Sequence, residues 1–431
     1  KKRVIYYYPL FYMSDTLSKI EKRTAYTLLL PAVFLVFSII LFPIFANIWI
    51  SFKEVSLKDI RIPEPRAKKI VKSVPDDKSK LKIIYKLRNS SLIQKISDVE
   101  FRDKLPNDVI PLDLDKRCTF KSKIIKCQFG DWQAKFRENF EILIKNEKNK
   151  AIDKKAIKSQ KPSLSGKADN ILLTTNFTLK NFKKVFYEND FADLLLTTFY
   201  FTFFGTVGAI VFGILAAQLV NQNFYGRSFM RSILLFPYVG PVVALAYTWT
   251  LLLDPNSGTL NALLVNFKIL DEPINLLGQK YITMNVLGFD FKLRLALTTV
   301  IFFEIWRYFP LAFLFILARL QAVPKDLYEA AEVDGAGPLK KFIHITLPQI
   351  TAIISILFMI RFIWNFNKFE DIFLLTGGAS GTRTLPINVY QQGFAVSDIG
   401  MGSAVSIVIV LLLIIFMFIY FKLIGKKANE I

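Results

Sequence analysis

Two ionisable side chains inside a long apolar run are the first candidates for chemistry in this chain. In the run FFEIWRYFP, Glu304 precedes Arg307 by three residues, and this spacing makes the two neighbours on a helix. Charged groups inside a membrane are costly and are therefore functional candidates by default. The two could form a structural ion pair that faces other helices, or they could have a functional role. A proton relay is a third alternative, weakened because other acidic residues are scarce in the apolar runs.

A run of interleaved aromatic and amide side chains is the second candidate. It lies in RFIWNFNKFEDIFLLTGG and comprises Trp364, Asn365, Phe366, Asn367 and Phe369. An aromatic ring can stack on the apolar face of a sugar, and amides both donate to and accept from hydroxyl groups. These residues could therefore contact a sugar. Aromatic side chains also fill protein cores and membrane belts, so plain packing is the alternative interpretation.

No catalytic constellation or metal site is evident in the sequence. The chain has one histidine, His344, and no HExxH, GxSxG or GxxxxGK[ST] motif. It therefore cannot hydrolyse ATP by the P-loop route, and uphill transport would need energy from a partner. We expect no metal and no cofactor bound by this chain. The two cysteines, Cys118 and Cys127, are nine residues apart, and they either close a small hairpin in an oxidising compartment or stay as unpaired thiols.

A polar stretch, EAAEVDGAGPLKKFIHITLP at residues 329–348, separates two of the long apolar runs. Ala330 and Ala331 favour a helix here. Gly335 can end that helix, and Pro338 can start another. The alanines expose little side chain, so the surface of another protein could approach the backbone closely. We therefore expect a helix, a turn and a helix that suit docking better than chemistry.

The spacing within this stretch resembles the EAA loop of ABC-importer permease subunits. The motif begins with Glu329-Ala330-Ala331 and continues, after a gap of three residues, with Gly335. A gap of nine residues then leads to Ile345, and a gap of one residue leads to Leu347-Pro348. The resemblance implies a coupling helix in the cytoplasm that sits in a cleft of a separate ATPase subunit. The coupling residues that it implies are Glu329, Ala330, Ala331, Asp334 and Gly335. The alternative is an ordinary cytoplasmic helix-turn-helix connector.

The elements that must position these residues are membrane spans. The chain has 431 residues, 52% of them hydrophobic and 14% aromatic, and several apolar windows exceed the roughly 20 residues that cross a bilayer. In the second span, Gly205, Gly208 and Gly213 permit close helix packing. In the third, Pro237, Gly240 and Pro241 should bend or open the helix near its start. The six expected spans lie at about residues 26–50, 194–220, 232–253, 293–317, 350–374 and 403–424.

Basic residues beside the spans predict their orientation. Lys19, Lys22 and Arg23 precede the first span and place the N-terminus in the cytoplasm by the positive-inside rule. Six spans then put the short loop with Arg227 and Arg231, the EAA stretch and the C-terminus on the cytoplasmic side as well. The expected segments are an interfacial cytoplasmic segment 1–25, a first span 26–50, an extracytoplasmic insertion 51–191, a permease core 192–424 with a cytoplasmic EAA loop at 321–349, and a cytoplasmic tail 425–431.

The insertion at residues 51–191 is long enough for a domain of its own. Short runs such as LKIIYKL and KIIKCQF, separated by Pro, Asn and Asp, predict a mixed or β-rich fold with a Lys-rich, less ordered stretch near 145–168. The insertion carries about +14 of the formal net charge of +21. It shows no RNP, zinc-finger or helix-turn-helix signature, so nucleic acid is not an expected partner. The charge could keep the domain soluble or meet an acidic surface of a binding protein.

The six spans are similar to those of the maltose-type, carbohydrate-importer branch of ABC permeases, and so is the aromatic and amide run with Thr376-Gly377-Gly378 and Thr384-Leu385-Pro386 after it. This similarity implies a place on the substrate path for Trp364, Asn365, Phe366, Asn367 and Phe369. This resemblance implies an all-α polytopic protein with a type I importer fold in a bacterial or archaeal cytoplasmic membrane. The implied partners are a second homologous permease subunit, a dimer of ATPase subunits that use ATP and Mg, and an extracytoplasmic solute-binding protein. The implied function is import of a sugar or oligosaccharide by alternating access.

Other functions also fit parts of the sequence. The solute could be glycerol phosphate, a polyamine or another small molecule. From different classes, the chain could be a membrane receptor whose insertion senses a ligand, or a secondary transporter in which Glu304 titrates or binds a cation.

Overall fold

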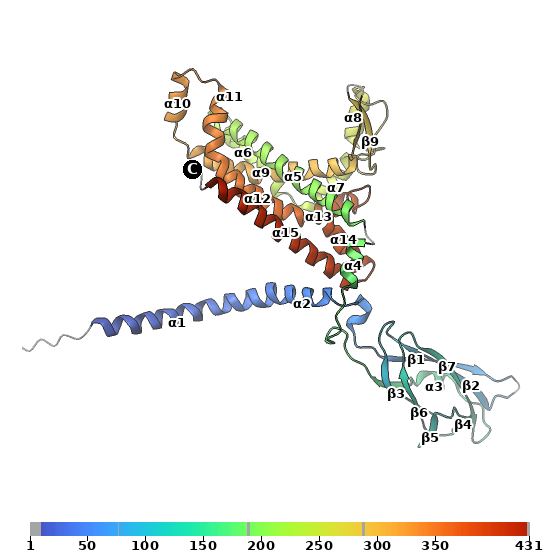
Figure 1. Cartoon of the computed structure of the whole chain (residues 1–431). Coiled ribbons are helices and arrows are strands. Elements are labelled where there is room, and N and C mark those ends of the chain that lie inside the picture. The colour runs from blue at the N-terminus through green and yellow to red at the C-terminus, as the bar shows by residue number, and fades with distance from the viewer. Residues whose placement is uncertain (1–9, 76, 188–189, 287–288, 429–431) are drawn as a thin grey trace, which may run out of the picture. The chain divides into compact units, whose positions relative to one another are not determined.

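The computed structural model describes all residues except 1–9, 76, 188–189, 287–288 and 429–431 (Figure 1). The chain divides into two compact units. A helical unit comprises Lys1–Ser51, Lys180–Val396 and Met401–Ile431, and a β unit comprises Phe52–Leu179 and Ser397–Gly400. The predicted cytoplasmic segments at 1–25 and 425–431 lie partly outside the described residues.

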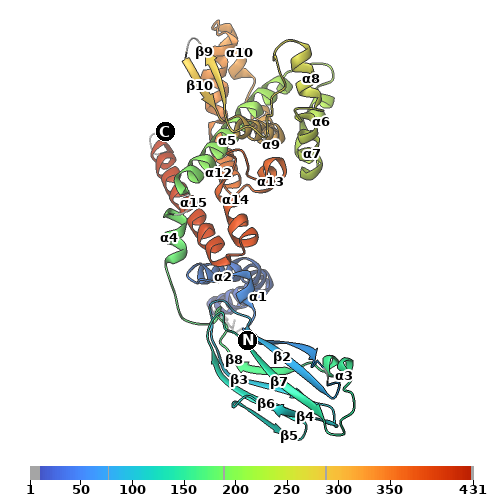
Figure 2. The ribbon, with the colours of Figure 1, turned by 90° about the vertical axis from the view of Figure 1, so that its right-hand side faces the viewer.

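The helical unit consists mainly of helices, with one short β-hairpin before α9 (Figures 1 and 2). The hairpin strands are β9 (Ile282–Val286) and β10 (Phe289–Leu293). Single π-helical turns lie at Phe37–Leu41, Phe342–Thr346 and Gln391–Ala395. The helices are α1 (Leu10–Val36), α2 (Phe42–Ser51), α4 (Lys180–Tyr187), α5 (Phe191–Asn221), α6 (Arg227–Val239), α7 (Val242–Leu252), α8 (Thr259–Asn266), α9 (Leu295–Gln321), α10 (Asp326–Val333), α11 (Pro338–Lys341), α12 (Leu347–Phe366), α13 (Glu370–Thr376), α14 (Leu385–Tyr390) and α15 (Ile399–Ala428).

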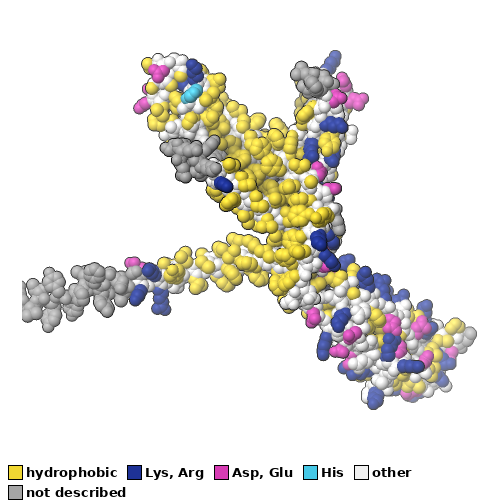
Figure 3. Space-filling model, in the orientation of Figure 1, with side chains coloured by type: hydrophobic (Ala, Val, Ile, Leu, Met, Phe, Trp, Pro, Cys, Tyr) yellow, Lys and Arg dark blue, Asp and Glu magenta, His cyan; other side chains and the backbone are white. Residues whose placement is uncertain are grey.

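Five helical segments among the described residues are long and apolar enough to cross a membrane. A sixth span results if the bent pair α6 and α7, whose axes meet at 93°, counts as one. Gly240 and Pro241 form this break, as expected, because proline lacks the N–H that a continuing helix needs. Pro237, which was expected to contribute, lies inside α6. Figure 3 shows hydrophobic side chains over the visible face of the helices. The five segments are Glu21–Ser51, Phe191–Asn221, Leu295–Gln321, Pro338–Phe366 and Ile399–Leu423.

The predicted bounds of the first and fifth spans differ from the structure. The first candidate span begins at Glu21 rather than at residue 26, and α1, which contains its start, begins at Leu10. The fifth span, expected to extend to residue 374, ends at Phe366, and α13 is a separate short helix. Asn367 leaves the helical conformation at φ −94° and ψ 8°, because asparagine competes with the helix backbone for hydrogen bonds and favours helix ends.

Helices α5 and α9 pack against each other through the glycines of α5. A Cβ atom added at Gly213 would lie 2.7 Å from the Ala312 Cβ and 2.9 Å from the backbone nitrogen of Phe313. Neither distance leaves room for a side chain. The glycines therefore permit the close approach of two membrane helices that the sequence predicts.

The β unit is a sandwich of two antiparallel four-stranded sheets, with strand orders β1-β2-β7-β4 and β5-β6-β3-β8. Strand β2 alternates buried and more exposed positions, with Leu81, Ile83, Tyr85 and Leu87 facing the core. Side chains of both sheets share this core. The elements are β1 (Pro65–Ser73), β2 (Lys80–Asn89), β3 (Ile96–Lys104), β4 (Val109–Asp113), β5 (Cys118–Lys121), β6 (Ile124–Trp132), β7 (Arg137–Asn146), α3 (Lys154–Ser159) and β8 (Ser163–Lys167).

The predicted β-rich character of the insertion is found, but two details of the prediction are wrong. The β unit ends at Leu179, before α4, so it is shorter than residues 51–191. The Lys-rich stretch near 145–168 is not poorly structured, because it contains α3 and β8. Ile157 anchors α3 in the core with no exposed surface, and the side chain of Asp153 caps that helix. One apolar anchor and one cap are enough to order a stretch whose lysines remain in solvent.

Candidate functional site

The polar stretch between α9 and α12 forms a helical hairpin. Helix α10 ends at a turn in which Gly335 takes φ +73°, and α11 begins at Pro338. The Ala336 N–H donates to the Ala331 carbonyl over 2.8 Å, which closes the end of α10 as in a Schellman turn. A helix, a turn and a helix therefore occur where the sequence predicts them.

Three polar contacts join the ascending and descending sides of this hairpin. One lies at its base, between α9 and α12, one lies halfway along it, and one lies near the turn. These contacts hold the two sides of the hairpin against each other. The contacts are Arg319 Nε to the Gln349 carbonyl (2.9 Å), Tyr328 hydroxyl with Thr346 hydroxyl (3.1 Å), and Lys341 Nζ to Glu332 (2.5 Å).

The hairpin has little buried surface of its own. No residue of α10 or α11 is buried. Val333 and Leu339, on either side of the turn, are 89% and 70% exposed. Exposed apolar side chains on a braced helical hairpin are typical of a protein docking surface.

A cluster of charged side chains lies inside the helical unit, on α9, α12 and α13. Arg361 of α12 donates to Glu304 of α9 over 2.6 Å, and their side chains are 1% and 0% exposed. Arg307 of α9 donates to Asp371 of α13. The predicted pairing of Glu304 with Arg307 is therefore wrong. Helices α12 and α13 each bring an opposite charge into the interior, and local spacing on α9 cannot reveal those partners.

Tyr308 lies among these charges. The guanidinium carbons of Arg361 and Arg307 lie 4.3 Å and 4.9 Å from its ring centroid, and Lys368 Nζ lies 4.1 Å from it. Lys368 also donates to the Tyr308 hydroxyl and lies 3.3 Å from Asp371. The cluster holds three cations and two anions. The aromatic face offsets part of the excess positive charge through cation–π contacts.

Polar atoms beside the cluster retain hydrogen-bonding capacity. The Asn365 side-chain nitrogen donates to the Thr206 hydroxyl over 3.2 Å. Within the described residues, the Asn365 amide oxygen and one carboxylate oxygen of Glu304 are buried and have no hydrogen-bond partner. Gly205 makes room for both residues, since a Cβ there would lie 3.2 Å from each side chain. These oxygens can accept hydrogen bonds from a polar solute.

The aromatic and amide run does not form one surface. Asn365 and Phe366 are buried at 1% and 4% exposure. Trp364 is 51% exposed, and Asn367 is exposed and donates to the carbonyl of Ile363 over 2.9 Å. Phe369 stands at the start of α13 and stacks on Phe373. A role of these side chains in a solute path stays a prediction.

Three members of the charged cluster were not singled out from the sequence. Arg361, Lys368 and Asp371 lie in or beside the aromatic and amide run. Their charge could have identified them in the sequence, because an ionisable residue in an apolar stretch is a functional candidate whatever its neighbours are. Aromatic residues separate these charges in the sequence, and that pattern is typical of a sugar-stacking surface.

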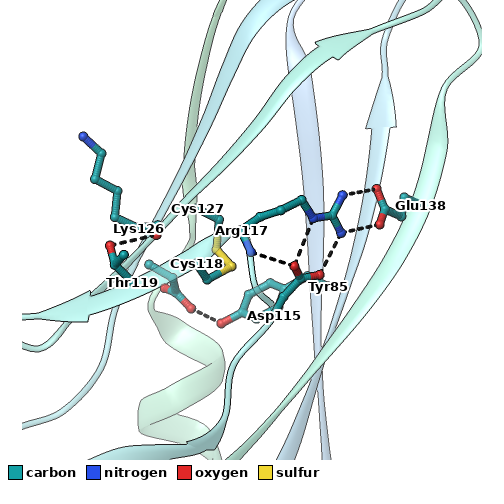
Figure 4. Close-up of a disulfide and its surroundings, with 9 residues drawn as sticks. Tyr85, Asp115, Arg117, Cys118, Thr119, Lys126, Cys127 and Glu138 are labelled. Atoms are coloured by element: carbon teal, nitrogen blue, oxygen red, sulfur yellow. Dashed lines mark hydrogen bonds and ion pairs between the residues drawn. A yellow bond between two sulfur atoms is a disulfide. The ribbon is translucent and has the colours of Figure 1, made fainter.

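In the β unit, Cys118 and Cys127 form a disulfide between directly opposite positions of β5 and β6 (Figure 4). Of the two alternatives left open by the sequence, the structure contains the bridge. Beside it, Arg117 donates to Asp115 (2.7 Å) and to Glu138 (2.5 Å). The hydrogen bonds from Arg117 lower the pKa of Asp115 to about 2. Among the described residues, no group of three or more His, Cys, Asp or Glu could hold a metal ion.

Comparison with known proteins assigns this architecture to a family. Residues 209–429 match the family described as "Binding-protein-dependent transport system inner membrane component". The chain belongs to this family. The permease is 33% identical over 230 residues to the inner membrane ABC transporter permease protein YcjO of Escherichia coli, an alignment that covers 53% of this chain and 73% of that protein.

Two further relatives have solutes in their names. The trehalose/maltose transport system permease protein MalF of Thermococcus litoralis is 30% identical over 246 residues, which cover 57% of this permease and 78% of MalF. The sn-glycerol-3-phosphate transport system permease protein UgpA of Escherichia coli is 30% identical over 258 residues, which cover 58% of this permease and 80% of UgpA. These alignments show that the chain is a permease of an ATP-driven importer.

A solved structure shows the same fold. It is a chain of a bacterial ABC transporter involved in the import of the acidic polysaccharide alginate, with a TM-score of 0.52 and 20% identity. The match covers 60% of the permease and 86% of that chain. The permease therefore has the fold of an ABC importer.

Proposed function

We propose that the permease imports a sugar or oligosaccharide delivered by an extracytoplasmic solute-binding protein. The name of the relative MalF supports a sugar, and so does the buried, unsatisfied Asn365 oxygen beside the aromatic run, since a hydroxylated solute can donate to it. The name of UgpA makes glycerol phosphate the second candidate. A solute screen with the purified binding protein separates the two.

The proposed power source is a dimer of ATPase subunits that use ATP and Mg. The observation that carries this proposal is the braced hairpin α10–α11, which exposes Val333 and Leu339 at its tip. In this proposal the hairpin docks in the ATPase, follows its closure as a lever, and reorients the spans together with a second homologous permease subunit. Glu329, Ala330, Ala331, Asp334 and Gly335 would form the docking face.

The proposed orientation follows from docking of the hairpin in the ATPase, which uses ATP in the cytoplasm. The hairpin and both chain termini lie in the cytoplasm, and the β unit lies on the extracytoplasmic side. The host membrane in this proposal is a bacterial or archaeal cytoplasmic membrane.

Substitution of two matched glycines tests the docking proposal. Gly335 and Gly226 both have positive φ, +73° and +86°, and nothing lies within 4 Å of a Cβ built on either. Gly335→Val and Gly226→Val therefore strain the backbone alike, but only the first distorts the hairpin. In the reconstituted complex, we expect Gly335→Val to lower solute-stimulated ATP hydrolysis and uptake at least tenfold. Gly226→Val should hydrolyse ATP and take up solute at nearly the rates of the unmodified permease. Equal behaviour of the two variants would contradict docking through the hairpin.

A charge reversal gives a second test that leaves the backbone alone. Glu329→Lys should insert normally, because Glu329 is exposed and lies outside the spans. We expect it to uncouple ATP hydrolysis from uptake. Lys340→Glu, an exposed reversal on α11, shows whether any charge change on the hairpin has this effect.

A further inference from the structure

Three arginines lie in one row across the outer face of a sheet in the β unit. Arg88 of β2 is directly opposite Arg66 of β1 on one side and Arg137 of β7 on the other. All three side chains are exposed. Like charges directly opposite each other destabilise a sheet, and none of the three takes part in the ion pairs found among the described residues of this unit. The row therefore carries a repulsion that a bound anion would relieve.

The next row of the same face adds two more cations. Lys68 is opposite Lys86, and Lys86 is opposite Asn139. The first acid on this face, Glu141, comes one row further and is paired with Lys82. The end of the sheet thus presents five cations and no unpaired carboxylate on this face.

A groove of about 760 Å³ opens beside the arginine row. Besides the three arginines, Lys58, Arg61 and Lys135 line it. Its two acids do not neutralise these cations. Asp59 and Glu64 together leave four of the six positive charges unbalanced. A second groove, of about 680 Å³, shares the three arginines and adds Lys68 and Lys86.

The rim of the first groove is apolar. Leu57, Ile62 and Leu92 line it and are 47%, 55% and 52% exposed. Exposed leucine and isoleucine beside arginine and lysine are typical of surfaces that lie in a membrane interface, where the apolar side chains enter the acyl boundary and the cations meet anionic headgroups. A free polar anion would leave these apolar side chains in water.

The chain itself ties this rim to two candidate spans. Leu57 follows Ser51, the last residue of the first span, by six residues. The Leu57 N–H also donates to the Ser397 carbonyl over 2.9 Å, and the Gly400 N–H donates to the Val55 carbonyl over 3.0 Å. Residues 397–400 lead directly into the span Ile399–Leu423. Six residues reach at most about 20 Å, so the chain keeps Leu57 within that distance of the end of the first candidate span.

We propose that the basic groove with its apolar rim binds the phosphate headgroups of anionic phospholipids. Arg66, Arg88 and Arg137 would hold the phosphate oxygens, for which the guanidinium fork is suited. Leu57, Ile62 and Leu92 would enter the interface. Anionic lipid would then fix the β unit against the membrane surface.

Nanodiscs of defined composition test this proposal on the full chain. The probe is hydrogen exchange at residues 57–66 and 88–92, compared between discs of phosphatidylcholine alone and discs that also contain phosphatidylglycerol. We expect exchange to slow at least tenfold with phosphatidylglycerol, and the protection to weaken at high salt. Equal exchange in both lipids would overturn the proposal. Protection that appears in phosphatidylcholine discs on addition of soluble inorganic phosphate or an acidic oligosaccharide would assign the groove to a free anion instead.

Matched variants isolate the arginine row. Arg66→Gln/Arg88→Gln/Arg137→Gln should abolish the difference between the lipids. The control is Lys104→Gln/Lys121→Gln/Lys154→Gln, which removes three exposed positive charges elsewhere on the same unit and should keep the difference. The arginine variant should be at least as thermally stable as the unmodified chain, because it removes like-charge repulsion. Loss of protection in both variants would point to net charge rather than to this groove.

Discussion

Arg361 of α12 and Glu304 of α9 form an ion pair of 2.6 Å whose side chains are almost completely buried. Removing one partner leaves the other charge buried and uncompensated, which costs about 3–5 kcal/mol. We therefore expect Arg361→Gln and Glu304→Gln each to lower the unfolding temperature of the purified permease sharply. The double variant Arg361→Met/Glu304→Leu should be more stable than either single variant, because apolar residues of similar volume often replace a buried pair without loss. Scanning fluorimetry measures all three.

An exposed ion pair of the same unit provides the control. Lys341 pairs with Glu332, whose side chain is 64% exposed, and pairs of this kind contribute about 0–1 kcal/mol. Glu332→Gln should therefore leave the unfolding temperature almost unchanged. If it lowers that temperature as much as Glu304→Gln does, burial is not the reason for the loss.

The outcome for Glu304 shows which features the sequence could predict. Features encoded by a few consecutive residues were predictable, such as the Gly335 turn and the helix break at Pro241. The partner of Glu304 was not, because Arg361 lies 57 positions away and only the packing of α9 against α12 brings the two together. The arginine row was equally hidden, since Arg66, Arg88 and Arg137 become neighbours only through strand register.

Gly213 provides a test of the packing of α5 against α9. A Cβ at this position would lie 2.7 Å from the Ala312 Cβ and 2.9 Å from the backbone of Phe313, and neither atom can yield without moving a helix. Overpacking of this kind typically costs about 1–3 kcal/mol. Gly213→Ala should therefore lower the unfolding temperature. Gly393→Ala is the matched control, because nothing lies within 4 Å of a Cβ at Gly393, and a loss of equal size there would show that the cause is not the helix contact.

The stability of the β unit should depend on pH through Asp115. Hydrogen bonds from Arg117 hold the pKa of Asp115 at about 2, below the ordinary value of 3.8. Because the folded-state pKa is the lower one, the contact stabilises the fold above about pH 4 and is lost as the pH falls towards 2. When thermal unfolding is measured from about pH 4 down to about pH 2, the unfolding temperature should fall less for Arg117→Gln than for the unmodified chain. Asp77, whose pKa is also about 2 because of hydrogen bonds from Ser79, keeps its contribution in both, so the difference between the curves reports the contacts of Arg117 with Asp115 and Glu138.

The disulfide between Cys118 and Cys127 tests the stability of the β unit and its proposed side of the membrane together. A bridge that closes a loop of this size stabilises by about 2–3 kcal/mol, so Cys118→Ser/Cys127→Ser should lower the unfolding temperature of the β unit. In whole cells, the native cysteines should react with a maleimide only after reduction, because disulfides persist in oxidising compartments. Val333→Cys, at the tip of the hairpin, should react only with a membrane-permeant maleimide. Labelling of the native cysteines without reduction, or of Cys at 333 by an impermeant reagent, would contradict the proposed orientation.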